Sequence, residues 1–123
     1  MSRDWLLHLD DLIESAEKIQ RFLKGRPRQG FASDEMLFDA VLFNLQVIGA
    51  AVKGIPEEAK ATVPQGDWSD PARLGELIAH HCFAVDPQIV WEAATQHIPR
   101  ILGYARQLRE RFDGGEDSSG APR

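Results

Sequence analysis

Cysteine and tyrosine each occur once in this sequence, as Cys82 and Tyr104. A single cysteine excludes an internal disulfide framework and a zinc site made of several cysteines. No glycine-rich phosphate loop is present, since neither G-x-x-x-x-G-K-S/T nor G-x-G-x-x-G occurs. The G-x-S-x-G elbow of serine hydrolases is missing, and so are the paired Glu-x-x-His motifs of di-iron bundles. We therefore expect neither a bound metal nor a cofactor.

Long apolar runs are missing as well. The uninterrupted apolar stretches span a few residues, whereas crossing a bilayer takes about 20. Arg3, Asp4, Asp10 and Asp11 interrupt the N-terminal apolar stretch, which therefore does not resemble a secretory signal. Nineteen acidic against fourteen basic residues give a net charge of −5, so contact with nucleic acid would need a local basic patch. We expect a soluble, cytoplasmic protein with no membrane partner.

Alternation with a period of two is essentially absent, and apolar residues instead recur every three or four positions, which predicts helices. The first helix covers about residues 4–24 and is followed by a basic, helix-breaking linker at 25–30. The second begins after Ser33 or Asp34, which are both good N-caps, and ends at Gly54. This second helix is apolar around most of its circumference, which indicates burial on more than one side, in a bundle or in an interface.

Two Asp-Pro pairs predict two further helix starts, because aspartate caps a helix and proline fits its first turn. The third helix begins at Asp70-Pro71 and the fourth at Asp86-Pro87. Pro99 falls inside the fourth helix and should kink it or split it in two.

The remaining stretches are polar. Residues 57–68 hold at most one short helical turn, and residues 113–123 are rich in glycine, serine and acid, so we expect this tail to be disordered. Residues 1–112 then form one domain. The fold class expected for it is all-α, an up-and-down bundle of four or five helices.

The most unusual polar sequence is His80-His81-Cys82, which follows an apolar run. Adjacent helical residues point about 100° apart, so three in a row bind one metal ion poorly. A second interpretation pairs His80 with Arg73, because seven residues are two helical turns and place both on one face, about 10 Å apart. In a third, the histidines fill a polar gap at a helix end and Arg73 is an ordinary solvated residue.

The second interpretation carries chemistry. A histidine moves protons near neutral pH, and an arginine binds phosphate through two hydrogen bonds and stabilises developing charge. Arg73 and His80 are therefore the candidate catalytic residues for metal-free RNA cleavage by attack of the 2′-hydroxyl.

Several segments, taken in order, resemble the HepT-like proteins, which are HEPN-type ribonuclease toxins paired with a minimal nucleotidyltransferase antitoxin. The resemblance covers about residues 4–105 and depends on the order and spacing of the segments. They are Phe31-Ala-Ser-Asp34, Asp39-Ala-Val-Leu-Phe-Asn-Leu45, Ile48-Gly-Ala-Ala51, Pro64, Trp68, Ala79-His80, Phe83-Ala-Val-Asp86, Val90-Trp91 and Ile98-Pro99.

The resemblance implies a helical bundle that forms a homodimer, with two histidine-bearing helices lining one cleft. It also implies an R-x(4–6)-H motif that cuts RNA without metal, in which His80 takes the place of the catalytic histidine. The partners it implies are an RNA substrate and the nucleotidyltransferase antitoxin.

This sequence departs from the family pattern at four positions. Gly75 and Glu76 stand where the family usually has Arg-Asn, which leaves Arg73 to complete the motif in its loosest form. Cys82 replaces a tyrosine that the antitoxin can modify with nucleotide, and Ala50 replaces a glutamate. These departures keep an alternative open, in which the chain is a catalytically degenerate dimer that binds a nucleotidyltransferase, nucleotide or RNA without cleaving.

Two basic clusters could give RNA a positive track that the overall charge does not provide, or could be ordinary solvated faces. They are Arg21, Lys24, Arg26 and Arg28, and Arg100, Arg106, Arg109 and Arg111. The three tryptophans, Trp5, Trp68 and Trp91, lie on apolar faces and are expected to anchor a core or an interface rather than to stack on bases.

Overall fold

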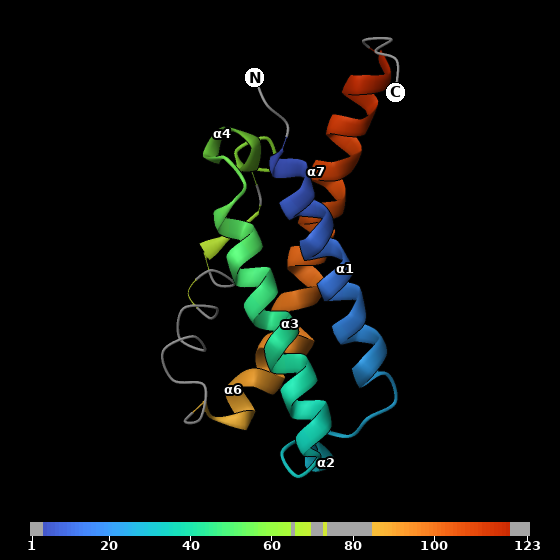
Figure 1. The fold of residues 1–123 in the computed structure, drawn as a ribbon, viewed down its shortest axis with the longest axis vertical. Coiled ribbons are helices and arrows are strands. Elements are labelled where there is room, and N and C mark those ends of the chain that lie inside the picture. The colour runs from blue at the N-terminus through green and yellow to red at the C-terminus, as the bar shows by residue number, and fades with distance from the viewer. Residues whose placement is uncertain (1–3, 65, 70–72, 74–84, 119–123) are drawn as a thin grey trace.

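The computed structural model describes residues 4–64, 66–69, 73 and 85–118, and over this part of the chain it is helical, with no strand (Figure 1). The expected all-α class is confirmed. The long helices are α1 (Trp5–Leu23), α3 (Glu35–Lys53) and α7 (Ile98–Ser118). The shorter elements are α2 (Arg28–Phe31), α4 (Glu57–Lys60), α6 (Pro87–Glu92) and the π-helical turn η1 (Ala93–His97).

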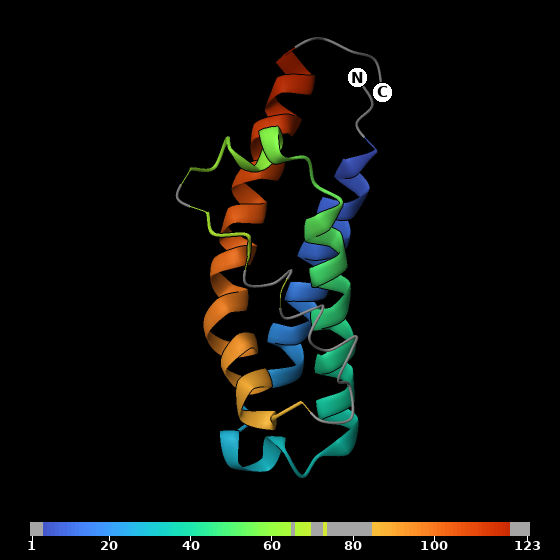
Figure 2. The ribbon, with the colours of Figure 1, turned by 90° about the vertical axis from the view of Figure 1, so that its left-hand side faces the viewer.

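The helices α3 and α7 both run opposite to α1, and the two views of the ribbon show the three lying side by side (Figures 1 and 2). Contacts between α1 and α7 show the antiparallel direction. The Trp5 and Phe112 rings meet edge to face with centroids 4.8 Å apart, and further along α1 Glu17 forms an ion pair with Arg106 at 2.8 Å. The partner on α7 thus moves toward its start as the chain advances along α1, which is the up-and-down arrangement that the sequence predicts.

The core lies where α1 meets α3 and α7, and α1 packs most extensively against α3. The buried side chains of α1 are spaced three or four residues apart, as expected for a helix that buries one stripe. The α1 side chains at this contact, all fully buried, are Leu9, Leu12, Ala16 and Ile19. The α3 side chains buried in the same core include Val41, Leu45, Ile48 and Val52.

The helix α3 is less completely covered than its composition suggests. Met36 and Phe43, seven residues apart on one face, are 85% and 64% exposed. Of the helices in the described residues, α3 alone is long and apolar enough to cross a membrane, a criterion that the core helix of a soluble protein also meets. The structure therefore buries one side of α3 in the bundle and leaves another apolar side open.

Helix boundaries follow the predicted signals closely. Leu37 N–H donates to Asp34 Oδ1 at 3.1 Å at the start of α3, and Gln88 N–H donates to Asp86 Oδ1 at 2.9 Å at the start of α6. Gly25 follows α1 with a φ of +74°, a left-handed conformation that glycine adopts without strain. The single turn expected between residues 57 and 68 is present as α4.

The linker expected at 25–30 is partly wrong, because the chain re-enters a helix at Arg28 and forms α2. Pro27 is extended and precedes the turn, where its missing N–H costs nothing. Phe31 then inserts into the core, 1% exposed, with its ring 5.5 Å from that of Phe38 and 5.3 Å from that of Trp91. Burial of this one ring outweighs the breaking tendency of the residues before it.

Pro99 splits the fourth helix as expected. It follows the π-helical turn η1, which separates α6 from α7. Proline cannot donate the backbone hydrogen bond of its position and crowds the preceding turn, so a locally widened turn relieves the clash.

The third predicted helix and the predicted C-terminal tail are described only in part. The third helix, opened by Asp70-Pro71, lies outside the described residues except for Arg73, which is helical. The helix α7 continues to Ser118, past the expected domain boundary at 112, because each added residue of a helix gains a backbone hydrogen bond without needing a core contact. The division into a domain and a tail stays a prediction.

Two leucines of α1 give a matched test of this packing. Leu12→Ala removes a fully buried side chain from the α1–α3 contact and should lower the free energy of unfolding by about 3 kcal/mol, through lost burial and the cavity left behind. Leu7→Ala makes the same change at a side chain that is 67% exposed and should cost about 0.5 kcal/mol or less. Urea denaturation followed by circular dichroism measures both, and equal losses in the two variants would contradict this core.

Candidate functional site

Of the two predicted catalytic residues, the structure describes Arg73 but not His80. Arg73 is exposed and helical. His80 lies outside the described residues, as do Gly75, Glu76 and Cys82, so their spacing from Arg73 stays a prediction. The described surroundings of Arg73 are the starting point for the site.

Asp67 lies within electrostatic reach of Arg73 and is held by its own turn. Its Oδ1 accepts hydrogen bonds from the Ser69 hydroxyl at 2.6 Å and from the Ser69 backbone N–H at 3.1 Å. These two bonds hold the pKa of Asp67 below its ordinary value, and the positive charges of Arg73 and Arg100 lower that pKa further. Arg73 and Arg100, far apart in the sequence, thus both lie within electrostatic reach of one carboxylate.

Arg100 comes from the first turn of α7. One of its nitrogens, Nη2, lies 3.0 Å from Nδ1 of His97, the last residue of the π-helical turn. An arginine donates to this ring nitrogen only if Nδ1 carries no proton, so the contact favours the tautomer protonated at Nε2. The sequence places Arg100 in a basic cluster, and its pairing with His97 was not predicted. The available signal was the spacing of three residues, which brings two side chains together on one helix face.

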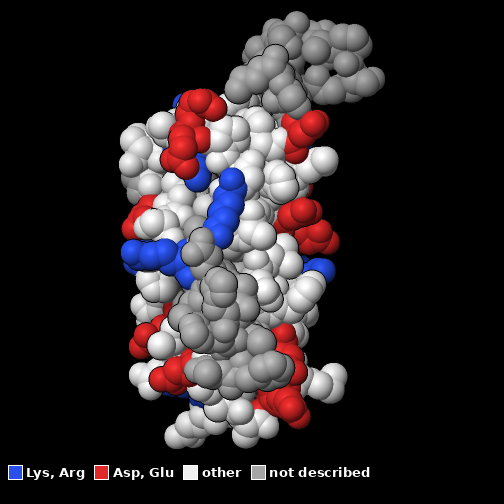
Figure 3. Space-filling view, turned by 60° about the vertical axis from the view of Figure 1, so that its left-hand side comes forward, with Lys and Arg blue, Asp and Glu red and all other residues white. Residues whose placement is uncertain are grey.

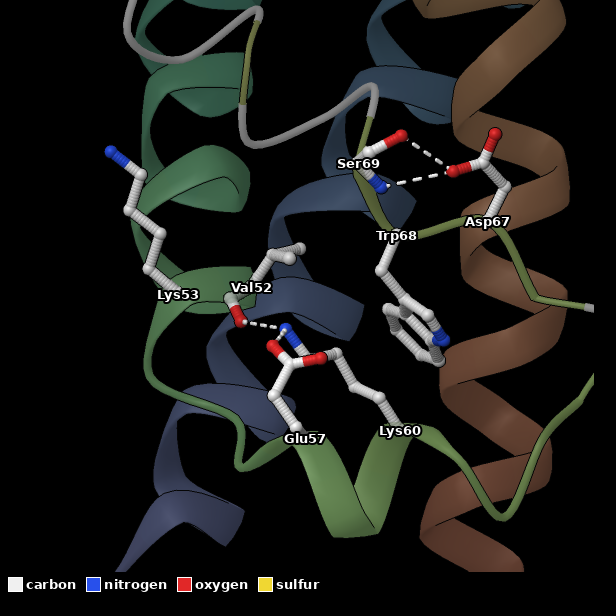
Figure 4. A pocket seen from close by; sticks show the side chains of 7 residues that line it. All are labelled: Val52, Lys53, Glu57, Lys60, Asp67, Trp68 and Ser69. Carbon is white, nitrogen blue, oxygen red and sulfur yellow. Dashed lines mark hydrogen bonds and ion pairs between the residues drawn. The ribbon is translucent and has the colours of Figure 1, made fainter.

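A surface hollow of about 490 Å³ adjoins this group, and Figure 4 shows how its side chains surround it. We call it the Trp68 hollow. It is formed by the end of α3, by α4 and by residues 67–69, and its lining residues are Val52, Lys53, Glu57, Lys60, Asp67, Trp68 and Ser69.

Lys60 is fixed at the floor of the Trp68 hollow. Its ammonium lies 2.9 Å from a Glu57 carboxylate oxygen and donates to the Val52 backbone carbonyl at 3.4 Å. The side chain is 11% exposed. A positive charge at the last turn of α3 also complements the negative end of the helix dipole, and it gives the Val52 carbonyl a second donor beside the Ile55 backbone N–H at 3.2 Å.

Trp68 forms the facing wall and is only 8% exposed. Its ring packs against the Tyr104 ring of α7, with centroids 6.0 Å apart. The indole N–H has no hydrogen-bond partner and lies against Gly66, where an added Cβ would come within 2.8 Å of the indole nitrogen. This close approach requires glycine at that position and keeps the ring in place.

The other tryptophans confirm the expectation of core anchors. Trp5 is 8% exposed and packs on Phe112, and the half-buried Trp91 packs on Phe31. The hydrophobic core itself includes Trp68, so its role is structural before any other.

Both basic clusters include arginines that are held in ion pairs. Arg106 and Arg109 form ion pairs with Glu17 and Asp10 of α1, at 2.8 and 3.4 Å, so they neutralise acids on the neighbouring helix. Only Arg100 of that cluster lies in reach of Asp67.

In the other cluster, Arg26 forms an ion pair with Asp34 at 3.1 Å. Among the described residues, no three His, Cys, Asp or Glu side chains gather as a metal ion would require.

The chain is similar to known proteins over most of its length. The model of a family described as ribonuclease HepT-like matches residues 12–108. A protein of Thermococcus cleftensis named "Probable ribonuclease HepT" is 31% identical over 110 residues, which are 89% of this chain and 100% of that relative. A "Putative RNase" of Methanocaldococcus jannaschii is 28% identical over 117 residues, which are 95% of this chain and 97% of that relative.

A longer relative from Methanocaldococcus jannaschii is named "Gamma-glutamylcyclotransferase and putative RNase". It is 25% identical over 118 residues, which are 96% of this chain, and this chain spans about half the length of that relative, 53%. No solved structure gives a significant match.

The turn at Asp67 gives a test of the local electrostatics. Ser69→Ala removes the hydrogen bond that lowers the pKa of Asp67 most, so this pKa should rise toward its ordinary value. Arg73→Ala should raise the pKa by less, because the charge acts through exposed solvent. Titration of the Asp67 carboxyl by NMR measures both shifts.

The sign of the pH dependence follows from the direction of the shift. Because the folded-state pKa is depressed, the stabilisation by the ionised Asp67 is present above its ordinary value of 3.8 and is lost as the pH falls through the lower folded-state value. An Asp67 pKa that does not move in Ser69→Ala would contradict the hydrogen bonds described here.

Proposed function

The chain belongs to the ribonuclease HepT-like family, and we propose that it is a metal-independent endoribonuclease toxin, cutting RNA in a cleft between two copies of the chain. A nucleotidyltransferase antitoxin is the proposed partner that neutralises it. The observation that carries the proposal is the family match over residues 12–108, a range that includes both Arg73 and His80.

The proposed chemistry needs only these two side chains and the RNA itself. His80 removes the proton from a 2′-hydroxyl, whose oxygen attacks the adjacent phosphorus, and the bond from phosphorus to the 5′-oxygen breaks. The leaving 5′-oxygen takes up the proton that His80 removed, so the histidine acts first as base and then as acid and ends in its starting state. The products are a 2′,3′-cyclic phosphate and a free 5′-hydroxyl. Arg73 binds the phosphate and stabilises the charge that develops on its oxygens.

The surroundings of Arg73 suit this role. Arg73 is exposed, so a bulky strand can reach it. Arg100 adds a second positive charge in the same neighbourhood, which partly offsets the motif positions held by Gly75 and Glu76. Both guanidiniums lie within electrostatic reach of one carboxylate, and guanidiniums bind phosphate through paired hydrogen bonds.

The proposed dimer is supported by the open side of α3. Met36 and Phe43 are large apolar side chains on one helix face, and they are 85% and 64% exposed in the single chain. A second copy that covers this face would remove apolar area from water, which is the main force in obligate association.

A cleavage assay in EDTA tests the function. Wild-type protein should cut single-stranded RNA, and His80→Ala should lower the rate at least about 100-fold, since a general acid–base group contributes that much or more. Arg73→Ala should lower the rate similarly, while Arg111→Ala, at an exposed arginine near the end of α7, should leave it unchanged. Size-exclusion chromatography checks that each variant keeps the oligomeric state of the wild type.

Two results would overturn the proposal in different ways. Cleavage that persists in His80→Ala removes this histidine from the mechanism. A folded dimer that leaves RNA intact in EDTA contradicts the enzyme and favours the degenerate alternative, a module that binds the nucleotidyltransferase, nucleotide or RNA without cutting.

A further inference from the structure

We propose that the Trp68 hollow receives one unpaired nucleobase of the RNA strand whose backbone passes Arg73. This inference rests on the proposed function and names a contact of the substrate outside the predicted Arg73–His80 pair.

The hollow has the dimensions of a small-molecule site. Its volume of about 490 Å³ falls within the about 300–1,000 Å³ typical of ligand pockets. Three separate segments build it, so it is a feature of the tertiary structure and not of one helix end (Figure 4).

The charges of the lining favour a neutral guest. Lys53 and Lys60 contribute two positive charges, and Glu57 and Asp67 contribute two negative ones. A phosphate group would meet as much repulsion as attraction there. A nucleobase is neutral and carries both hydrogen-bond donors and acceptors, and it would meet acceptors and donors of the lining together with the apolar surface of Trp68.

The walls are set before a ligand arrives. Lys60 is fixed by Glu57 and by the Val52 carbonyl, and Trp68 is fixed between Tyr104 and Gly66. Because the indole N–H lies against Gly66, the indole offers the hollow its ring and not its donor. A rigid site loses little conformational entropy on binding, which favours affinity.

The position of the hollow lets one strand use both sites. Asp67 lines the hollow and also lies within electrostatic reach of Arg73 and Arg100. Figure 3 shows lysine and arginine side chains in the middle of the face beside the grey segment, with most acidic side chains toward its edges. The arginines outside the hollow would bind the negatively charged phosphate, and the hollow, with equal numbers of positive and negative side chains, would bind the neutral base.

Binding of non-cleavable RNA tests the inference without depending on turnover. The probe is a 2′-O-methyl oligonucleotide, compared with a set of the same strand carrying one abasic residue at each position in turn. Trp68→Leu should weaken binding of the complete strand about 10-fold, near the lower end of the loss for one aromatic–base contact, because only 8% of Trp68 is exposed. Ser69→Ala, an exposed substitution that leaves the core intact, should weaken it by a smaller factor. Neither variant should change binding of the strand that is abasic at the position the hollow holds.

Trp5→Leu is the matched control. Trp5 has the same 8% exposure as Trp68 and also packs on an aromatic ring, but it does not line the hollow. It should cost stability as Trp68→Leu does and leave RNA binding unchanged. If Trp68→Leu fails to fold by circular dichroism, Trp68→Phe and Ser69→Ala decide the question.

Each outcome separates this inference from the proposed function. If wild-type protein cleaves RNA but both hollow variants bind the complete strand normally, the inference is wrong and the function stands. If the variants weaken complete and abasic strands equally, the hollow does not hold a base. Adenosine monophosphate that binds as tightly as the strand and is lost with Trp68→Leu would show a free-nucleotide site and overturn the RNA assignment. If wild-type protein binds no strand and cleaves none, both proposals fail.

Discussion

The antiparallel contact between α1 and α3 is the constraint on which the rest of the bundle depends. Leu9, Leu12, Ala16 and Ile19 of α1 are fully buried, and the same helix also packs on α7. A helix that contacts both neighbours constrains their directions, because side chains interlock only in a narrow range of crossing geometries. The end of α3 and the start of α7 are thereby placed around residues 66–69, where the candidate site lies.

The site combines groups that are far apart in the sequence. Lys60 from α4 and Asp67 from a turn both line one hollow, and Arg100 of α7 lies within electrostatic reach of Asp67. Each group is held by a local contact: Lys60 by Glu57 and a helix-end carbonyl, Asp67 by Ser69, Arg100 by His97. The overall charge of −5 therefore says little about this place, where positive and negative groups are separated over short distances.

Local signals in the sequence were reliable for element boundaries and weaker for assembly. Asp34 and Asp86 predicted their helix starts, and Pro99 predicted the break that the structure shows as a π-helical turn. The linker before Phe31 was misjudged, because its composition is helix-breaking while a buried ring at its end stabilises one turn. Arg73 and His80 could be nominated from spacing and resemblance, and the pairs His97–Arg100 and Glu57–Lys60 had a local signal in their spacing of three residues. The Trp68 hollow could not be predicted, since nothing local marks residues of α3, α4 and 67–69 that meet only after the bundle closes.

The sequence by itself determined the helical class, the helix starts and stops, the apolar stripes of α1 and α3, and the family. These depend on spacing along one chain and on the chemistry of single residues. Only the tertiary structure decided that Arg100 joins Arg73 beside Asp67, that Arg106 and Arg109 neutralise acids of α1, and that Trp68 walls a hollow. The physical reason is that short-range electrostatics and packing depend on distance in space, and the packing of the helices sets that distance.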